Sequence, residues 1–278
     1  MVEVPSPPVS SRRPGAVWNW KFHGAWITPA LSLVACLALW EAVVRYAQVP
    51  VYLVPAPSLI ATKLVAAYPL FLQETLHSVV SIIVGFALAV LIGIPAATLM
   101  IYSEWFRRGV YPILLTAQVL PKVALAPLFI VWFGFGLLPK VLMTFLISFF
   151  PIVIDTLTGL NSVRPESLML IRSMGGTRWQ SFWKIRLPSA LASIFGGFKV
   201  AITFAVVGTI VAEFVGSDHG LGYILVLARG NLDTVTVFAA ILWLIAIGFL
   251  FYFAVEVAER FFVKGRAANR KHELGAGL

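Results

Sequence analysis

The chain has 278 residues, of which 60% are hydrophobic and only 12% charged, and its mean hydropathy is +0.92. Water-soluble domains are about half apolar and about a quarter charged, so this composition excludes an ordinary soluble protein and indicates a chain that needs lipid. The net charge of +9 does not indicate nucleic-acid binding, because Lys and Arg fall between apolar runs, as they do in membrane proteins.

The first apolar stretch follows a short basic segment that contains Arg12 and Arg13. This stretch is too long for the apolar core of a cleaved signal peptide and lacks a small-residue cleavage site, so we expect a retained first span. We assign residues 1–25 to a cytoplasmic tail, and residues 26–72 to the first span with an external segment behind it.

Six apolar segments are long enough to cross a bilayer as helices, which takes about 20 residues. They cover approximately residues 27–46, 79–101, 110–134, 138–160, 189–216 and 236–258. The third contains Pro112, Pro121, Lys122 and Pro127, which predict a kinked or broken helix because proline removes a backbone donor. The sequence therefore predicts an all-α membrane protein with about six transmembrane helices.

The distribution of Lys and Arg between these spans predicts the orientation. With the N-terminus inside, fifteen cations lie on the cytoplasmic side and three outside. The cytoplasmic ones are Arg12, Arg13, Lys21, Arg107, Arg108, Arg164, Arg172, Arg178, Lys184, Arg186, Arg260, Lys264, Arg266, Arg270 and Lys271, and the external ones are Lys63, Lys140 and Arg229. Because cytoplasmic loops retain an excess of cations, we predict both termini inside, a transmembrane core at 73–260 and a cytoplasmic tail at 261–278.

The cytoplasmic segment between spans four and five, residues 162–188, is too organised to be a simple connector, and we call it the 162–188 loop. Pro165 and Glu166 suit the first turn of a helix that stops at Gly175. Thr177 matches the N-cap of a capping box, with a glutamine three residues later, and predicts the start of a second helix.

The second short helix places aromatic residues on one face. Trp179, Phe182 and Trp183 fall within about 100° of one another on a helical wheel, and Lys184 lies opposite. Two interpretations are open: an amphipathic helix that anchors the chain at the membrane surface, or a docking element for a cytoplasmic partner.

The segment PESLMLIRSMGGTRWQSFWKIRLP, residues 165–188, resembles the EAA loop of ABC importer permeases. Gly175, Ile185, Leu187 and Pro188 stand at the family's spacing, whereas Met-Leu-Ile replaces the E-A-A triplet, so a salt-bridge role for the triplet's glutamate does not transfer. The resemblance implies that the loop forms coupling helices seated in a cleft of an ATPase subunit. The residues it assigns to coupling are Pro165, Glu166, Arg172, Gly175, Thr177, Trp179, Trp183, Lys184, Ile185, Leu187 and Pro188.

A second segment, VAEFVGSDHGLGYIL at residues 211–225, resembles the end of span five in permeases of the nitrate/sulfonate/taurine type. Residues 39–58 and 121–136 are similar to the N-terminal region and the third span of the same group. The matching positions in the second segment are Glu213, Gly220, Leu221, Gly222 and Tyr223. These resemblances imply the type I ABC importer permease fold.

Span five, residues 189–216, carries small residues every three or four positions, which predicts close packing against other helices. It also carries Lys199 and Glu213, about 21 Å apart along the helix and so unable to pair. Ionisable groups in a span normally face a protein interior or a water-filled path, so both are candidates for the translocation path or its gate. Glu213, near the external end, could instead reach a loop amide. The remaining candidates are Lys122, Asp155, Gly220, Gly222 and Tyr223.

The sequence shows no catalytic constellation, and we expect a transport component, not an enzyme. The phosphate-loop pattern is absent, Cys36 is the single cysteine and the four histidines have no metal-binding spacing, so we expect no cofactor and no metal site.

The expected function is that of the membrane-spanning permease subunit of an ATP-driven ABC importer, in the cell inner membrane, which moves a small solute inward by alternating access. The resemblance implies two ATPase subunits, a second copy of the permease and a periplasmic or lipid-anchored solute-binding protein as partners. It also suggests nitrate, a sulfonate or taurine-like anion, or a small heterocycle such as a pyrimidine vitamin precursor as solute. The alternatives are an ion-gradient-driven secondary transporter, for which we detect no inverted repeat, and a membrane-embedded enzyme.

Overall fold

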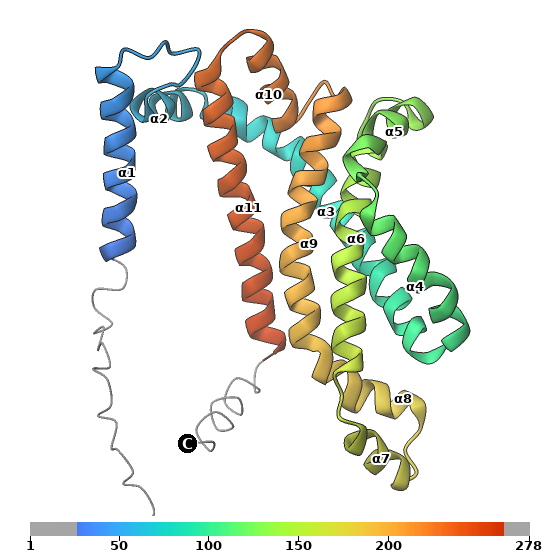
Figure 1. Ribbon diagram of the computed structural model, residues 1–278. Coiled ribbons are helices and arrows are strands. Elements are labelled where there is room, and N and C mark those ends of the chain that lie inside the picture. Colours follow the sequence, from blue (N-terminus) through green and yellow to red (C-terminus); the bar gives the residue numbers. More distant parts are fainter. Residues whose placement is uncertain (1–26, 264–278) are drawn as a thin grey trace, which may run out of the picture. The chain divides into compact units, whose positions relative to one another are not determined.

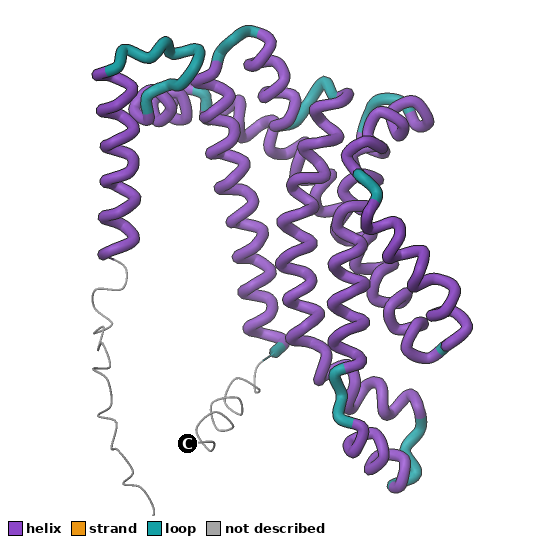
Figure 2. The backbone as a smooth tube through the Cα atoms, viewed as in Figure 1, coloured by secondary structure: helices purple, strands orange, loops and turns teal. Residues whose placement is uncertain are grey.

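A computed structural model describes residues 27–263, and all of its regular structure in that range is helical (Figures 1 and 2). The chain divides into two units, Met1–Val49 and Pro50–Leu278, which we describe separately. The predicted N-terminal tail, residues 1–25, and residues 264–278 of the predicted C-terminal tail lie outside the described residues, whereas residues 261 and 262 belong to the last turn of α11.

The first unit contains α1 (Ile27–Tyr46), which coincides with the predicted first span. Its side chains are mostly apolar and mostly exposed, as expected of a helix that meets lipid. Near its end, Arg45 forms an ion pair with Glu41 one turn earlier.

Most residues of the second unit lie in helices, and the loops between the helices are short (Figure 2). They are α2 (Pro57–Ala66), α3 (Tyr68–Tyr102), α4 (Glu104–Val119), a short 3-10 turn (Lys122–Leu125), α5 (Ala126–Phe133), α6 (Leu137–Asn161), α7 (Pro165–Ser173), α8 (Arg178–Ser181), a π-helical turn (Phe182–Arg186), α9 (Leu187–Gly216), α10 (Leu221–Gly230) and α11 (Thr234–Phe262).

Five described helices are long and apolar enough to span a membrane, and α4 with α5 forms a sixth span if that bent pair crosses as one unit. The pair bends by 90° between Val119 and Lys122. Pro121 sits in the break and Pro127 in the first turn of α5, so the predicted break in the third span is confirmed. The second span differs from its prediction, since α3 begins at Tyr68 and not near residue 79.

The core of the second unit is the packing of α6 against α9 and α3. A methyl group on Gly197 would lie 2.7 Å from the Asp155 Cβ, and one on Gly208 would lie 3.0 Å from the Thr144 Cα. Between these glycines, Ala201 and Ala205 are fully buried. The predicted small-residue face of span five is therefore confirmed, because only small side chains let the helices approach this closely.

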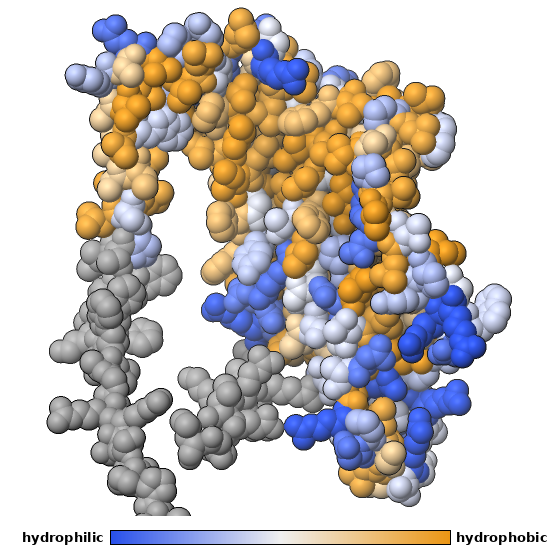
Figure 3. All heavy atoms as spheres, viewed as in Figure 1, coloured by the Kyte–Doolittle hydropathy of each residue, from blue (hydrophilic) through white to orange (hydrophobic). Residues whose placement is uncertain are grey.

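Cations predicted to be cytoplasmic gather at one end of the second unit. α7 and α8 lie at one end and α10 at the other (Figure 1). Hydrophilic side chains gather around α7 and α8, whereas the surface over the middle of α9 and α11 is mostly hydrophobic (Figure 3). Eight of the fifteen cations predicted to be cytoplasmic are described, and the five in the 162–188 loop lie at the α7–α8 end.

Candidate functional site

The first half of the 162–188 loop is a short exposed helix that ends in a glycine bend. α7 begins at Pro165 with Glu166 in its first turn, as predicted, and none of its side chains is buried. It ends in a Schellman motif: the Gly176 N–H donates to the Ile171 carbonyl at 2.8 Å, and the Gly175 N–H to the carbonyl of Arg172 at 2.9 Å. Gly175 has φ +76°, in the left-handed region that glycine occupies without strain.

The second half starts with the predicted capping box, which is confirmed. The Thr177 N–H donates to the Gln180 side chain at 2.9 Å, and the Gln180 N–H donates to the Thr177 hydroxyl at 3.2 Å. Leu187 and Pro188 begin α9 as expected, but no break separates α8 from it. The π-helical turn, in which Lys184 and Ile185 lie, joins α8 directly to span five.

Three aromatic residues of the loop contact one another, as their helical spacing predicted. Trp179 and Trp183 lie with their ring centroids 5.4 Å apart, and Phe182 lies 5.4 Å from Trp183. Phe182 is buried against Leu160 of α6 and Ile194 of α9, whereas the two tryptophans are 69% and 50% exposed. The buried Phe182 ring therefore fixes the cluster to the bundle, and the two tryptophans form its exposed apolar surface.

Arg186 is a residue of this loop that sequence reasoning did not select. Its guanidinium donates to the Leu160 carbonyl at 3.0 Å and lies over the Tyr102 ring. A cation at the end of α6 interacts favourably with the helix dipole and satisfies a free carbonyl. Only the fold brings these residues together, since 26 positions separate Arg186 from Leu160.

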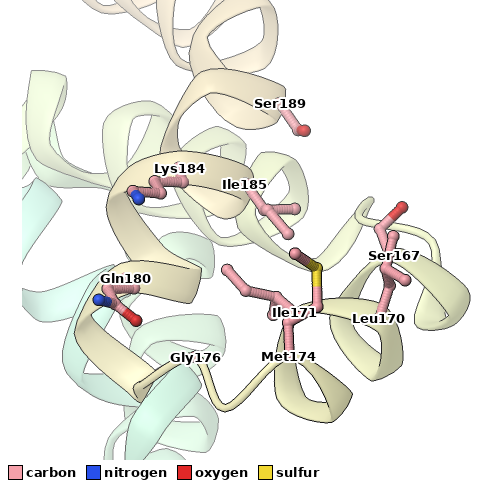
Figure 4. Close-up of a pocket in the computed structure, with 9 residues that line it drawn as sticks. All are labelled: Ser167, Leu170, Ile171, Met174, Gly176, Gln180, Lys184, Ile185 and Ser189. Carbon is pink, nitrogen blue, oxygen red and sulfur yellow. The ribbon is translucent and has the colours of Figure 1, made fainter.

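A groove of about 550 Å³ lies between α7 and the start of span five. Its walls are mixed, and the apolar side chains of Ile171, Met174 and Ile185 lie around it (Figure 4). The remaining lining residues are Ser167, Leu170, Gly176, Gln180, Lys184 and Ser189. Met174 is 78% exposed. An exposed groove with apolar side chains and a cation, here Lys184, at its edge is typical of a protein-binding surface.

A second cluster of the predicted residues lies at the opposite end of the unit, around Glu213. We call it the Glu213 cluster: Glu213, Glu74, Ser78 and the backbone N–H groups of residues 220–222. The Ser78 hydroxyl donates to Glu213 at 2.8 Å, and the Gly222 N–H donates to the same carboxylate at 2.8 Å. The N–H groups of Gly220 and Leu221 donate to Glu74 and to the Ser78 hydroxyl.

The Glu213 cluster satisfies successive free N–H groups at the start of α10, where carboxylates are favoured by the helix dipole. Glu213 is 1% exposed. Gly220 has φ +111°, and a methyl group on Gly222 would lie 2.6 Å from the Glu213 Cβ, so both positions require glycine. Glu213 thus reaches a backbone amide, that of the second residue of α10. Tyr223 is half-buried on the first turn of α10.

The other ionisable candidates lie apart from this cluster. Lys199 pairs with Glu256 and Glu259 of α11. Asp155 is half-buried on α6, facing Gly197 of α9. Lys122 donates to the Gln118 carbonyl at the end of α4 and lies 4.6 Å from the centroid of the Phe150 ring.

One carboxylate outside the spans has a shifted pKa. Burial raises the pKa of Asp233, but hydrogen bonds from Thr236 and the ammonium of Lys63 outweigh it and hold the pKa below its ordinary value. Asp233 caps α11, and its 3.2 Å contact with Lys63 ties α11 to α2.

The chain is similar in sequence to a known family of membrane transport proteins. Residues 89–264 match the model of the family described as "Binding-protein-dependent transport system inner membrane component". The formylaminopyrimidine transport permease ThiX of Halalkalibacterium halodurans is 34% identical over 241 residues, 86% of this chain and 96% of that one. The taurine transport permease TauC of Escherichia coli K12 is 28% identical over 250 residues, 87% and 91% of the two chains.

A solved structure of the methionine ABC transporter MetNI in inward-facing conformations has the same fold. It covers 71% of this chain and 98% of its own, with a TM-score of 0.63 and 19% identity. The likeness at this identity concerns the fold.

Proposed function

Because this chain belongs to the binding-protein-dependent transport system inner membrane components, as an ABC importer permease of the nitrate/sulfonate/taurine type, we propose that its 162–188 loop receives force from a separate ATPase subunit. Membership of this family excludes an ion-gradient-driven secondary transporter and indicates a transport component of the inner membrane, not an enzyme. The single observation that carries the proposal is an exposed groove, with Ile171, Met174 and Ile185 around it, joined without a break to a span.

The connection between the loop and the bundle supports transmission of a displacement. α8 passes into α9 through the π-helical turn, and the Phe182 ring lies buried between α6 and α9. α9 in turn packs on α6 through glycine and alanine, so the two helices shift together and do not slide independently. A force applied to Trp179 and Trp183 therefore acts on the α6–α9 pair.

The family implies ATPase and solute-binding protein partners. We propose two ATPase subunits and a second copy of this chain, since each copy offers one docking surface and a two-fold pair is the commonest closed symmetry. The excess of cations at the α7–α8 end supports a cytoplasmic position for that end and both termini inside. The solute-binding protein would then meet the end that carries α10.

We assign the gate to the Glu213 cluster with Gly220, Gly222 and Tyr223, because this cluster fixes the start of α10 against α3 and α9. Asp155 of α6 and Lys122 of the 3-10 turn are proposed to line the path, since each is a half-buried ionisable group. Lys199 is a weaker candidate, since two carboxylates of α11 already neutralise its charge.

We propose a small heterocycle of the pyrimidine class as solute, in preference to nitrate or a sulfonate. The identity with the formylaminopyrimidine permease is higher than with the taurine permease. The two lysines proposed for the path also favour a heterocycle over an anion, because both already have partners. Lys199 pairs with carboxylates, and Lys122 contacts a backbone carbonyl and an aromatic ring. An anion in the path would be best bound by a cation that has no such partner.

Uptake into proteoliposomes tests the proposal. The chain would be reconstituted with its cognate ATPase and solute-binding protein, and uptake of labelled formylaminopyrimidine and taurine would be measured with and without ATP. We expect ATP-dependent uptake of the pyrimidine and tenfold less of taurine. Taurine uptake above that of the pyrimidine would overturn the solute, and uptake that does not depend on the ATPase would overturn the coupling.

A further inference from the structure

The fold brings three metal-ligating side chains together next to the Glu213 cluster. Glu74 and His77 lie three residues apart on α3, so they share one face of that helix. His219 comes from the turn between α9 and α10, and its ring stacks on that of His77 with centroids 4.8 Å apart. One ligand atom from each residue lies within 4.8 Å of the other two.

From this geometry we propose that Glu74, His77 and His219 form a binding site for a divalent transition-metal ion of the zinc class, which ties the turn between α9 and α10 to α3. Two imidazole nitrogens and one carboxylate oxygen are ligands of open zinc sites, in which water fills the fourth position. Mg²⁺ and Ca²⁺ prefer oxygen ligands throughout, so the site selects against them.

The Glu74 carboxylate and the turn that carries His219 are held in place by hydrogen bonds. Glu74 is 7% exposed, and its Oε2 accepts the Gly220 N–H at 2.6 Å, which leaves Oε1 toward His219 Nδ1 at 3.8 Å. Lys140 of α6 fixes the turn between α9 and α10 by donating to the His219 carbonyl at 3.0 Å. Hydrogen bonds of this kind, one shell out from the ligands, are what orient metal-binding side chains.

Zinc binding would require only rotation of the two histidine rings. Zinc bonds of about 2.0–2.2 Å in a tetrahedron place ligand atoms about 3.4 Å apart, so the rings must turn to close the present separation. Both histidines are exposed, which leaves their rings free to rotate. The charges nearby act in opposite directions: Asp218 lies 3.9 Å from His219 Nε2 and favours a cation, whereas the Lys140 ammonium opposes it but contacts the backbone carbonyl.

A zinc titration of the full chain, purified in detergent with a histidine-free affinity tag, tests the site. Binding is followed by competition with a chromophoric chelator, and Mg²⁺ in excess checks selectivity. The chain supplies its own control, since His23 and His272 are its other two histidines. We expect one zinc ion per chain in the wild type and in H23A/H272A, and at least tenfold weaker binding in H77A/H219A.

Thermal unfolding shows whether the variants are folded. H77A/H219A should unfold without zinc at the wild-type temperature. Added zinc should raise the unfolding temperature of the wild type and of H23A/H272A but not of H77A/H219A. Hydrogen exchange at residues 217–222 should slow on zinc addition in the wild type and not in the variant. The same zinc affinity in H77A/H219A as in the wild type, or displacement of zinc by Mg²⁺, would overturn the proposal. If H77A/H219A is misfolded, the same comparison is made with H219N, for which unchanged zinc affinity would likewise overturn it.

Discussion

Replacement of Gly175 tests whether the bend in the 162–188 loop transmits force. Its φ of +76° lies in the left-handed region, and an added Cβ would meet nothing within 4 Å, so the cost of Gly175→Ala is backbone strain alone. That strain is about 1–2 kcal/mol for a residue with a Cβ. It would lower the population of the native bend about 5- to 30-fold relative to other conformers of the loop.

Gly175→Pro cannot reach this φ at all and also loses the 2.9 Å bond to the Arg172 carbonyl. Gly175→Asn is the matched control, because asparagine tolerates the left-handed region.

The assay is solute taken up per ATP hydrolysed, in proteoliposomes that hold the whole transporter. We expect asparagine to match the wild type, alanine to lower the ratio severalfold and proline to abolish uptake while ATP hydrolysis continues. The amount of inserted chain should be equal in all four proteins, since α7 has no buried side chain. A wild-type ratio in the proline variant would refute the reasoning.

Further predictions concern other contacts of the bundle. Ser78→Ala leaves the buried Glu213 carboxylate one donor short, which should cost about 1–3 kcal/mol and lower the unfolding temperature in detergent; an unchanged temperature would contradict this bond. Lys199→Met removes the cation shared by Glu256 and Glu259 of α11, of which Glu256 keeps its pair with Arg260, and should lower stability. Lys199→Arg should retain that stability, as measured by thermal unfolding. Because the folded pKa of Asp233 is depressed, its contribution to stability is present above the unfolded value near about 4 and is lost as the pH falls through the folded pKa. The protection of amides in the first turn of α11, taken as exchange relative to the intrinsic rate at each pH, should therefore fall at low pH in the wild type, and Asp233→Asn should show no such step.

Local signals in the sequence predicted much of the fold. Five of the six predicted spans overlap long apolar helices, and the third is broken where Pro121 interrupts it. The capping box at Thr177 and the bend at Gly175 were also predictable, because each depends on residues close in the chain. The early start of α3 was not, since Glu74 and His77 lower the hydropathy there and find their partners only in the folded chain.

The site could be predicted only in part, because its key contacts join distant residues. Glu213 was selected as an ionisable group within a span, but its Ser78 partner lies 135 positions away. The same holds for Arg186 and for the two stacked histidines, which have no metal-binding spacing in the sequence. Periodicity reports which face of a helix is apolar; it does not report which helices meet.

The most direct test of the coupling proposal is the side of the membrane on which the 162–188 loop lies. Met174 is 78% exposed, and a Met174→Cys variant in a chain with Cys36→Ser carries a single thiol. A membrane-impermeant maleimide should label it in inside-out vesicles and not in right-side-out vesicles, and bound ATPase should protect it. Labelling from the periplasmic side, or no protection by the ATPase, would contradict the account.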